Sequence, residues 1–271
     1  MLTLVPTPIG NIADISLRAM DALKNADILL CEDTRVTKKL LHILQERYSL
    51  ERKEQEFISL HSHNEQAFIE KTTPSFFESN VVYVSDAGMP GISDPGQLLV
   101  RYCQDENIEY DILPGANALL TAFVASGFVN TQMLFFGFLP HKGKDRAQAL
   151  QSALHNGFTT ILYEAPHRLD KLLKELSEEV PQRRIFCAKE LTKKYQNYFH
   201  GKAADILKEI LRSEIKGEWV VVIEAGEARQ SSVSENDVLE LDIPKKSAAK
   251  LISKITGENT KACYQRLLDS E

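Results

Sequence analysis

The stretch Tyr83-Val-Ser-Asp-Ala-Gly-Met-Pro-Gly-Ile-Ser-Asp-Pro-Gly96 decides how this chain folds. It follows the apolar residues 81–84, which have the character of a buried strand, and it precedes residues 97–103, whose apolar periodicity predicts a helix. Its three glycines let the backbone approach a ligand closely, and its two prolines hold the turn in one shape. Because open parallel sheets bind ligands at the carboxyl ends of their strands, we interpret this loop as a ligand site rather than an ordinary connection.

Two further loops lead from a strand into a helix. Residues 6–11, Pro-Thr-Pro-Ile-Gly-Asn, follow a short strand at residues 2–5 and precede a helix expected over residues 14–25, with Asp14 as its N-cap. Residues 114–117, Pro-Gly-Ala-Asn, open an apolar helix over residues 118–126. Neither loop has the signature of Rossmann dinucleotide binding or of a P-loop. The loops therefore indicate a nucleotide-like ligand that is held by backbone in a different way.

Strand-like runs alternate with helical or loop segments in two series, which predict domains over residues 1–128 and 129–226. The fold class is therefore α/β, with two α/β/α domains whose sheets are mixed and mostly parallel. The expected strands are residues 2–5, 28–31, 57–60, 81–84 and 110–113, then 133–137, 159–163, 184–188, 195–200 and 219–224.

Residues 227–271 are expected to form a linker and a small helical C-terminal segment. The polar residues up to 234 have linker composition, and helices are predicted over residues 246–255 and 259–268. The glycine-bearing turn between them fits either a helix-turn-helix or a plain helical hairpin.

Composition limits the class of protein. Of the 271 residues, 43% are hydrophobic and 26% are charged, as in a globular protein. The apolar runs are too short to span a bilayer and the N-terminus lacks a basic leader, so neither membrane insertion nor secretion is expected. The four cysteines stand far apart, which argues against disulfides and structural zinc and favours the reducing cytoplasm.

Charge is distributed unevenly. The net charge of −6 argues against a general nucleic-acid binder, yet residues 243–266 carry six basic side chains and one acidic side chain. Lys245, Lys246 and Lys250 in this segment are candidate RNA contacts. The alternative is a solvated helix face.

Eight motifs occur in a fixed order over residues 2–223: Pro6-Thr-Pro-Ile-Gly-Asn11, Cys31-Glu-Asp-Thr-Arg35, His61-Ser-His-Asn-Glu65, Ser85 to Gly96, Leu113-Pro-Gly-Ala-Asn117, Gly137-Phe-Leu-Pro140, Tyr163-Glu-Ala-Pro-His-Arg168 and Ala188-Lys-Glu-Leu-Thr192. Together they closely resemble the ribosomal RNA small subunit methyltransferase I family, within the tetrapyrrole (corrin/porphyrin) methylases. A weaker resemblance extends into the tail.

The resemblance implies an activity, a cofactor and a partner. It implies methylation of the ribose 2′-hydroxyl of a decoding-centre cytidine in 16S rRNA of the small ribosomal subunit, with S-adenosyl-L-methionine bound between the two domains and no metal. A homodimer is expected as well. Carried over by alignment, the cofactor-binding residues are Gly88, Met89 and Ile92 in the loop, Thr121 and Ala122 in the following helix, and Tyr163 and Glu164 at a strand end, with Asp86 as a further candidate.

The acceptor side requires a group that takes the hydroxyl proton. Asp33 and His63 are candidate bases, and Arg35 has the forked donors that suit a phosphate. The alternatives are a turn in which Asp33 pairs with Arg35 and caps the next helix, and a polar loop or helix cap around His63. The identity of the base stays open.

Arg168 follows Pro166, which suits the first turn of a helix. It is predicted to contact the RNA backbone, with a helix-surface salt bridge as the alternative.

Two other functions compete with this interpretation. A small-molecule methylase acting on a tetrapyrrole would not require the basic tail, and its loop would differ from the form seen at residues 85–96. A non-enzymatic nucleic-acid-binding regulator built on the tail helices would leave the glycine- and proline-rich loops unexplained.

Overall fold

The chain forms two compact units. In the computed structural model they comprise Met1–Glu227 and Ala228–Glu271, and the residues described are 1–129, 131–212, 215–228 and 235–269. Part of the predicted linker, residues 229–234, lies outside the described residues. The larger unit holds both predicted sheets, and the described part of the smaller unit is mainly helical.

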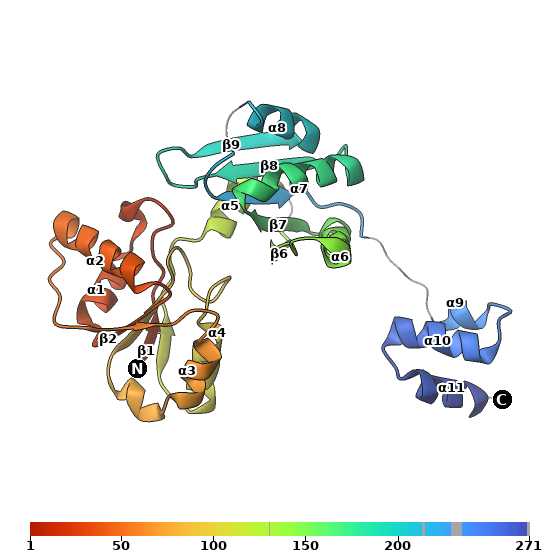
Figure 1. Ribbon diagram of the computed structural model, residues 1–271, viewed down its shortest axis with the longest axis horizontal. Helices are drawn as coiled ribbons and strands as arrows, with labels where there is room; N and C mark the ends of the chain where they lie inside the picture. Colours follow the sequence, from red (N-terminus) through yellow and green to blue (C-terminus); the bar gives the residue numbers. More distant parts are fainter. Residues whose placement is uncertain (130, 213–214, 229–234, 270–271) are drawn as a thin grey trace. The chain divides into compact units, whose positions relative to one another are not determined.

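The first sheet has five strands in the order β3-β2-β4-β1-β5, and all neighbouring pairs are parallel (Figure 1). Its strands are β1 (Leu2–Leu4), β2 (Ile28–Cys31), β3 (Glu56–Ser59), β4 (Val81–Val84) and β5 (Tyr110–Ile112). The connecting helices are α1 (Leu17–Asn25), α2 (Thr34–Tyr48), α3 (Glu65–Lys71) and α4 (Gln97–Asp105), with short 3-10 turns at Ile12–Asp14 and Pro74–Glu78.

Strand β4 is buried on both faces because helices cover both sides of the sheet. Val82 packs with buried residues of α1 and α2, whereas Tyr83 packs on the other face with Leu99 of α4. Successive side chains of a strand point to opposite faces, so a central parallel strand needs an unbroken apolar run. The sequence of residues 81–84 meets that need and delivers the following loop to the centre of the sheet's carboxyl edge.

Helix α1 begins later than the sequence predicts. Its N-cap is Ser16, whose hydroxyl accepts a hydrogen bond from the Ala19 N–H. Asp14 instead ends the preceding 3-10 turn, which Asn11 caps. The prediction of Asp14 as the N-cap is therefore wrong, because two residues with capping side chains lie close together and composition alone does not choose between them.

The second sheet is mixed, with the order β6-β7-β10-β8-β9. Strands β6 (Met133–Phe138) and β7 (Thr159–Glu164) are parallel, and the other neighbours are antiparallel. The remaining strands are β8 (Arg184–Lys189), β9 (Asn197–Lys202) and β10 (Trp219–Ile223). Helices α6 (Gly143–Leu154), α7 (Pro166–Glu179) and α8 (Ala203–Ile210) share a core with one face. The last strand in sequence thus lies centrally, and all its residues are buried.

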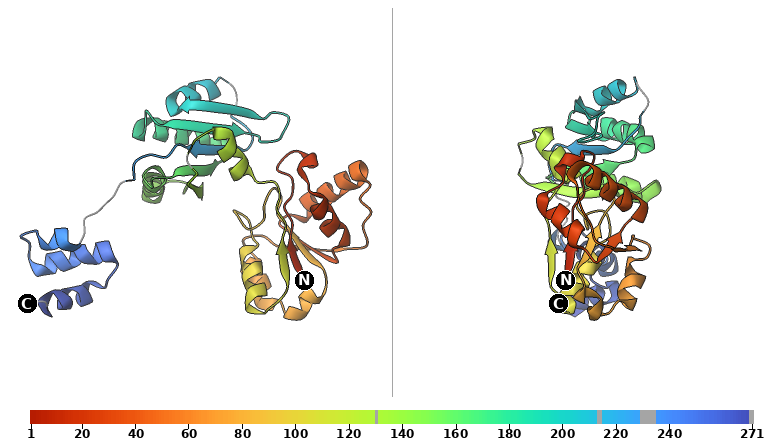
Figure 2. Two further views of the ribbon diagram at one scale, coloured as in Figure 1. Left: turned by 180° about the vertical axis from the view of Figure 1, so that it is seen from behind. Right: turned by 90° about the vertical axis from the view of Figure 1, so that its left-hand side faces the viewer.

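Helix α5 (Ala118–Ser126) covers the opposite face of the second sheet (Figure 2). Its buried Leu119 and Ala122 pack with Ile161 of β7 and Val220 of β10. The predicted boundary at residue 128 groups this helix with the first sheet, whereas its packing is with the second. Because α5 begins just after β5 and packs on β10, it brings the loops of both sheets to one place.

The smaller unit contains α9 (Glu235–Leu239), α10 (Lys245–Thr256) and α11 (Thr260–Asp269). The two predicted helices, α10 and α11, are confirmed and share a small core, and Gly257 ends α10 in the left-handed conformation at φ 77°. Across the residues that the structure describes, none of the helices combines the length and apolar character needed to cross a membrane.

Candidate active site

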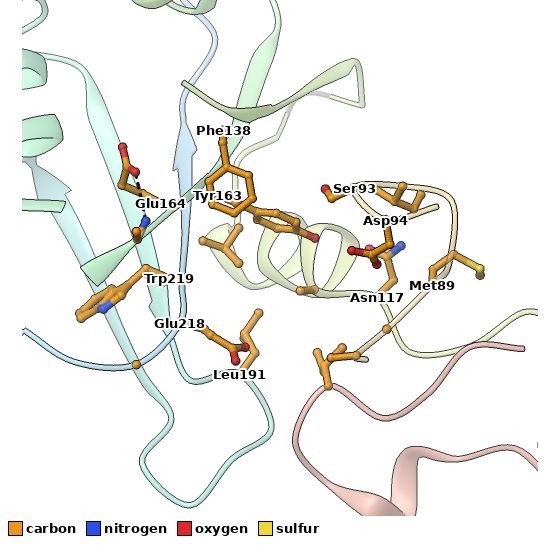
Figure 3. Close-up of a pocket in the computed structure, with 18 of the residues that line it drawn as sticks. Met89, Ser93, Asp94, Asn117, Phe138, Tyr163, Glu164, Leu191, Glu218 and Trp219 are labelled. Carbon is orange, nitrogen blue, oxygen red and sulfur yellow. Dashed lines mark hydrogen bonds between the residues drawn. The ribbon is translucent and has the colours of Figure 1, made fainter. Parts of the chain in front are cut away.

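A cavity of about 350 Å³ lies between the loops of the two sheets, within the larger unit (Figure 3). From the first sheet it is lined by Ile9 after β1 and by the loop after β4. From the second sheet it is lined by the ends of β6 and β7 and by the start of β10, and α5 contributes Asn117 and Ala118. Its size is that of a small-molecule site, and it opens at the strand ends where parallel sheets bind ligands.

Gly88 brings bare backbone to the cavity wall. It pairs with Thr7 through two hydrogen bonds, Thr7 N to Gly88 O at 2.9 Å and Gly88 N to Thr7 O at 3.0 Å. Its φ is +85°, which L side chains rarely adopt, and a Cβ here would lie 3.1 Å from Ile9 Cγ2. This position therefore favours glycine, which leaves the space beside the loop to a ligand.

The far end of the same loop is held by a buried carboxylate. Glu65, at the start of α3, is 8% exposed, and its Oε1 accepts a hydrogen bond of 2.8 Å from Gly96 N. Gly96 has φ +132°, and its position for a Cβ is closed by Leu4 and Tyr83 at 3.2 Å. The backbone of the loop is thus anchored at both Gly88 and Gly96.

Aromatic side chains form the wall on the side of the second sheet. Tyr163 packs edge-to-face with Phe138, at a centroid distance of 5.6 Å, and with Phe135 at 5.0 Å. Burial raises the pKa of Tyr163 to about 12, so its hydroxyl stays a neutral donor near neutral pH. In Figure 3 this hydroxyl points across the cavity toward the carboxylate of Asp94.

Asp94 is the acidic side chain of the loop that lines the cavity. Burial raises its pKa to about 6, with a further contribution from the negative charges of Glu32 and Asp86, while the nearby Ser85 side chain acts in the opposite direction. Its carboxylate therefore changes protonation close to neutral pH.

A buried ion-pair network lies behind the aromatic wall. The carboxylate of Glu164, at the end of β7, is fully buried. It lies 3.1 Å from Arg168 Nε and 3.6 Å from Arg146 Nη2. Arg146 in α6 is also buried, and it pairs with Glu175 at 2.7 Å. The charges compensate one another, which is the condition for keeping them away from water.

The two arginines also hold the chain that follows Phe138. Arg168 Nη2 donates to the carbonyl of Leu139 at 2.6 Å, and both guanidinium groups donate to the carbonyl of Pro140, at 3.1 Å from Arg146 and 3.2 Å from Arg168. Because these carbonyls follow Phe138 directly, the network fixes the position of the aromatic wall.

Comparison with known proteins places this geometry in a family. The model of the tetrapyrrole (corrin/porphyrin) methylases matches residues 1–207. The chain belongs to this family. A curated relative from Campylobacter fetus, ribosomal RNA small subunit methyltransferase I, is 47% identical over 270 residues, which is 99% of this chain and 100% of the relative. The protein of the same name from Helicobacter pylori is 43% identical over 285 residues, covering 100% of this chain and 99% of the relative.

Solved structures show the same fold at low sequence identity. The methyltransferase CobJ is 18% identical with a TM-score of 0.57, over 83% of this methylase and 94% of that chain. A uroporphyrin-III C-methyltransferase from Thermus thermophilus, solved with S-adenosyl homocysteine, is 15% identical with a TM-score of 0.53, over 82% and 96% of the two chains. The predicted fold class, two α/β domains with mixed and mostly parallel sheets followed by helices, is confirmed.

Five of the predicted cofactor-binding residues line the cavity of this methylase: Gly88, Met89, Ile92, Tyr163 and Glu164. Thr121 and Ala122 lie outside the lining. Ala122 is fully buried against the second sheet, and the Thr121 hydroxyl donates to the Asn117 carbonyl at 2.7 Å. The residues at the start of α5 that line the cavity are the N-cap Asn117 and Ala118, one turn earlier, so Thr121 and Ala122 as cofactor contacts stay a prediction.

Asp86 and Asp33 belong to a separate turn at the ends of β4 and β2. Asp86 Oδ1 accepts from Asp33 N at 3.0 Å, and its pKa is raised by burial and then by Glu32. Asp33 caps α2 through Arg35 N at 2.8 Å and pairs with the Arg35 guanidinium at 2.6 Å, which lowers the pKa of Asp33 to about 2. The structure thus gives Asp33 the capping role that the sequence left as an alternative, while Arg35 remains 89% exposed.

His63 lies outside the cavity lining, on the turn before α3. It is exposed, and its ring packs edge-on to His61 at a centroid distance of 5.9 Å. This is the polar loop that the sequence offered as the alternative to a catalytic base.

Arg168 also differs from its prediction. Its side chain is 16% exposed and faces Glu164 and the two carbonyls after Phe138. A guanidinium held in this way has few donors left for a phosphate, so the predicted RNA contact is corrected to a buried structural ion pair.

The sequence also missed several residues that line the cavity: Asn117, Phe138, Leu191, Glu218 and Trp219. Phe138 and Leu191 stand within quoted motifs, so their position there was an available signal. For Glu218 and Trp219 the sequence carries no such signal, because these residues reach the cavity only through the central position of β10 in the second sheet.

Proposed function

We propose that this methylase transfers a methyl group from S-adenosyl-L-methionine to the ribose 2′-hydroxyl of a decoding-centre cytidine in 16S rRNA. The observation that carries the proposal is the identity of 47% to a ribosomal RNA small subunit methyltransferase I over that protein's whole length. The tetrapyrrole enzymes among the structural relatives are 18% identical or less and support the fold alone. A small-molecule substrate therefore has the weaker support.

The residues of the cavity fit S-adenosyl-L-methionine. The backbone at Gly88 leaves room for close approach, and the volume of about 350 Å³ suits a nucleoside with an amino-acid arm. The lining joins apolar groups such as Ile9 with the acceptor of Glu218, which suits hydroxyl and ammonium groups. When bound, the cofactor supplies a methyl group on a positively charged sulfur.

The chain's own groups then have three tasks, which are to align the acceptor, exclude water and accept a proton. The aromatic wall of Phe138 and Tyr163 and the fixed loop at Gly88 enclose the reacting groups. Arg35, highly exposed in the first turn of α2 beside its partner Asp33, is proposed to contact a phosphate of the RNA. Clusters of three or more potential metal-binding side chains are absent from the described residues, and the proposed reaction needs no metal.

The smaller unit is proposed to hold the RNA backbone. Lys246, Lys250 and Lys254 stand four residues apart on α10 and are exposed, so they form one basic stripe. Lys245 is only partly exposed, and Arg266 pairs with Glu235 and Glu258. The stripe is therefore the part of the basic tail best suited to phosphate contacts.

The test is to map ribose methylation in the 16S rRNA of a strain that lacks this gene. We expect one cytidine of the decoding centre to lose its 2′-O-methyl group and to regain it when the intact gene is returned. An unchanged methylation pattern, or loss of a methyl group from a base, would contradict the proposal. Calorimetry with S-adenosyl-L-methionine in the presence of a chelator tests metal-free binding separately.

Two further expectations accompany this function. We expect the methylase in the cytoplasm, as its separated cysteines predict, and imaging of a tagged protein checks this. The homodimer that we expect is checked by analytical ultracentrifugation of the purified chain.

A further inference from the structure

We propose that Asp94 is the catalytic base that accepts the proton of the ribose hydroxyl during methyl transfer. The inference rests on the proposed function and assigns a residue that the sequence left open. It follows from which carboxylates reach the cavity, what each one already binds, and what faces Asp94.

Asp94 differs from the other carboxylates that line the described cavity. Glu164 is buried between two arginines, at 3.1 Å and 3.6 Å. Glu218 is 74% exposed and pairs with Lys193 at 3.0 Å. Among the described residues Asp94 forms no ion pair, and the charged groups that influence it, Glu32 and Asp86, are negative. A carboxylate bound to a cation is a poor proton acceptor, so Asp94 is the one whose chemistry suits the task.

The groups that face Asp94 come from three strands. The loop before it contributes Asp86 and Ser85, and β2 is followed by Glu32. From the second sheet, the hydroxyl of Tyr163 points at Asp94, and the proximity of Asp94 contributes to the raised pKa of Tyr163. Burial and, after it, the negative neighbours favour the protonated form of Asp94, and together they bring its pKa up to about 6, where a base works efficiently near neutral pH.

Tyr83 lies outside the cavity lining and brings a further hydroxyl close to the same carboxylates. Its hydroxyl is fully buried and has no hydrogen-bond partner among the described residues. Its pKa is raised by burial and then by the charges of Glu32 and Asp94, so the hydroxyl lies close to the same carboxylates.

The proposed step balances as follows. The ribose oxygen forms a bond to the methyl carbon, the carbon–sulfur bond breaks with its electron pair left on sulfur, and the hydroxyl proton moves to an Asp94 carboxylate oxygen. The sulfonium becomes a neutral thioether, and Asp94 becomes neutral until it releases the proton to solvent. Tyr163, a neutral donor, is placed to orient the carboxylate toward the acceptor.

The experiment compares Asp94→Asn with the intact protein and with Asp105→Asn, an exposed residue of α4 that pairs with Arg101. For Asp94→Asn we expect turnover on small ribosomal subunits to fall by about 10² to 10⁴. The affinity for S-adenosyl homocysteine, measured by calorimetry, should stay within a few-fold, which also shows that the variant is folded. In the intact protein, turnover should rise tenfold per pH unit below about pH 6, and Asp94→Asn should lose that dependence.

Three outcomes would overturn the inference. Full turnover by Asp94→Asn would exclude the base, and a large loss of S-adenosyl homocysteine affinity with normal turnover at saturation would make Asp94 a cofactor ligand instead. If turnover by Asp94→Asn still rises with pH below about pH 6, another group accepts the proton of the ribose hydroxyl. If the intact protein methylates the ribose in these assays, the proposed function stands whichever result the variant gives.

Discussion

Replacing Arg146 by Met should destabilise the second sheet without touching the cavity lining directly. Arg146 is 3% exposed and lies 3.6 Å from the fully buried carboxylate of Glu164 and 2.7 Å from Glu175. Met keeps most of the side chain's length and removes the charge. Removing one member of a buried pair costs about 3–5 kcal/mol, because the other charge stays buried without compensation. Glu164 keeps Arg168 at 3.1 Å and Glu175 is 24% exposed, so we expect about 3 kcal/mol.

The chain's single tryptophan makes the measurement specific. Trp219 lies in β10 of the second sheet and is 3% exposed, so its fluorescence reports unfolding of this sheet during a urea titration. With a slope of about 2–3 kcal/mol per molar urea, the midpoint should fall by about 1–1.5 M. Lys174→Met is the matched control, since its partner Asp170 lies 3.4 Å away and both are well exposed. Its cost should be below about 1 kcal/mol.

A double variant separates charge from packing. Adding Glu164→Gln to Arg146→Met removes the carboxylate that was left unpaired, so part of the lost stability should return. If Arg146→Met is as stable as the Lys174→Met control, the ion-pair reasoning is refuted. If the double variant loses further free energy of unfolding, as much again as the single variant lost, the destabilisation reflects lost packing rather than an unpaired charge.

Three further predictions concern the cofactor and the RNA. Gly88→Val should abolish binding of S-adenosyl-L-methionine in calorimetry, whereas Gly127→Val should not, because both residues have positive φ but only Gly88 has a close neighbour, Ile9. Arg35→Ala should lower methylation of small subunits about tenfold with unchanged cofactor affinity, as expected for one charged hydrogen bond, with Arg47→Ala at the far end of α2 as control. A chain ending at Glu227 should still bind the cofactor but methylate poorly. Its RNA affinity should fall less steeply with salt: the slope of log affinity against log salt concentration should become shallower by about 0.7 for each phosphate that the tail no longer neutralises. If activity and slope are both unchanged, the tail does not bind RNA.

The elements that the sequence predicted well are those fixed by local patterns. The run at residues 81–84 is apolar at every position, and only a strand covered on both faces needs that. Asn117 followed by an apolar helix is a capping pattern, and the structure shows its side chain accepting from Leu120 N at 3.1 Å. At residues 81–84 and at Asn117, the residues that favour the local structure are also the ones that its surroundings require.

Long-range pairing lay beyond what the sequence could provide. Arg146 meets Glu164 across a loop and a strand, and neither residue's own surroundings reveal the pair. In the same way, nothing local to β10 states that the last strand enters between β7 and β8, which is what brings Trp219 to the cavity. The residues that the alignment selected on α5, Thr121 and Ala122, lie one helical turn beyond Asn117 and Ala118, which line the cavity.

The cavity depends on contact between the two sheets, and the chain places strained backbone at that contact. Thr192, in the loop after β8, has φ 63°, which is unusual for a β-branched residue, and Glu190 has φ 50°. Thr192 Oγ1 accepts from Asn11 N at 3.0 Å, and Gly10 lies so close that an added Cβ would fall 2.8 Å from the same oxygen. Strain of this kind persists only where surrounding contacts hold it. The loops after β1 and β8 are therefore fitted to each other, so glycine at residue 10 serves the junction between sheets while glycine at residue 88 serves the ligand.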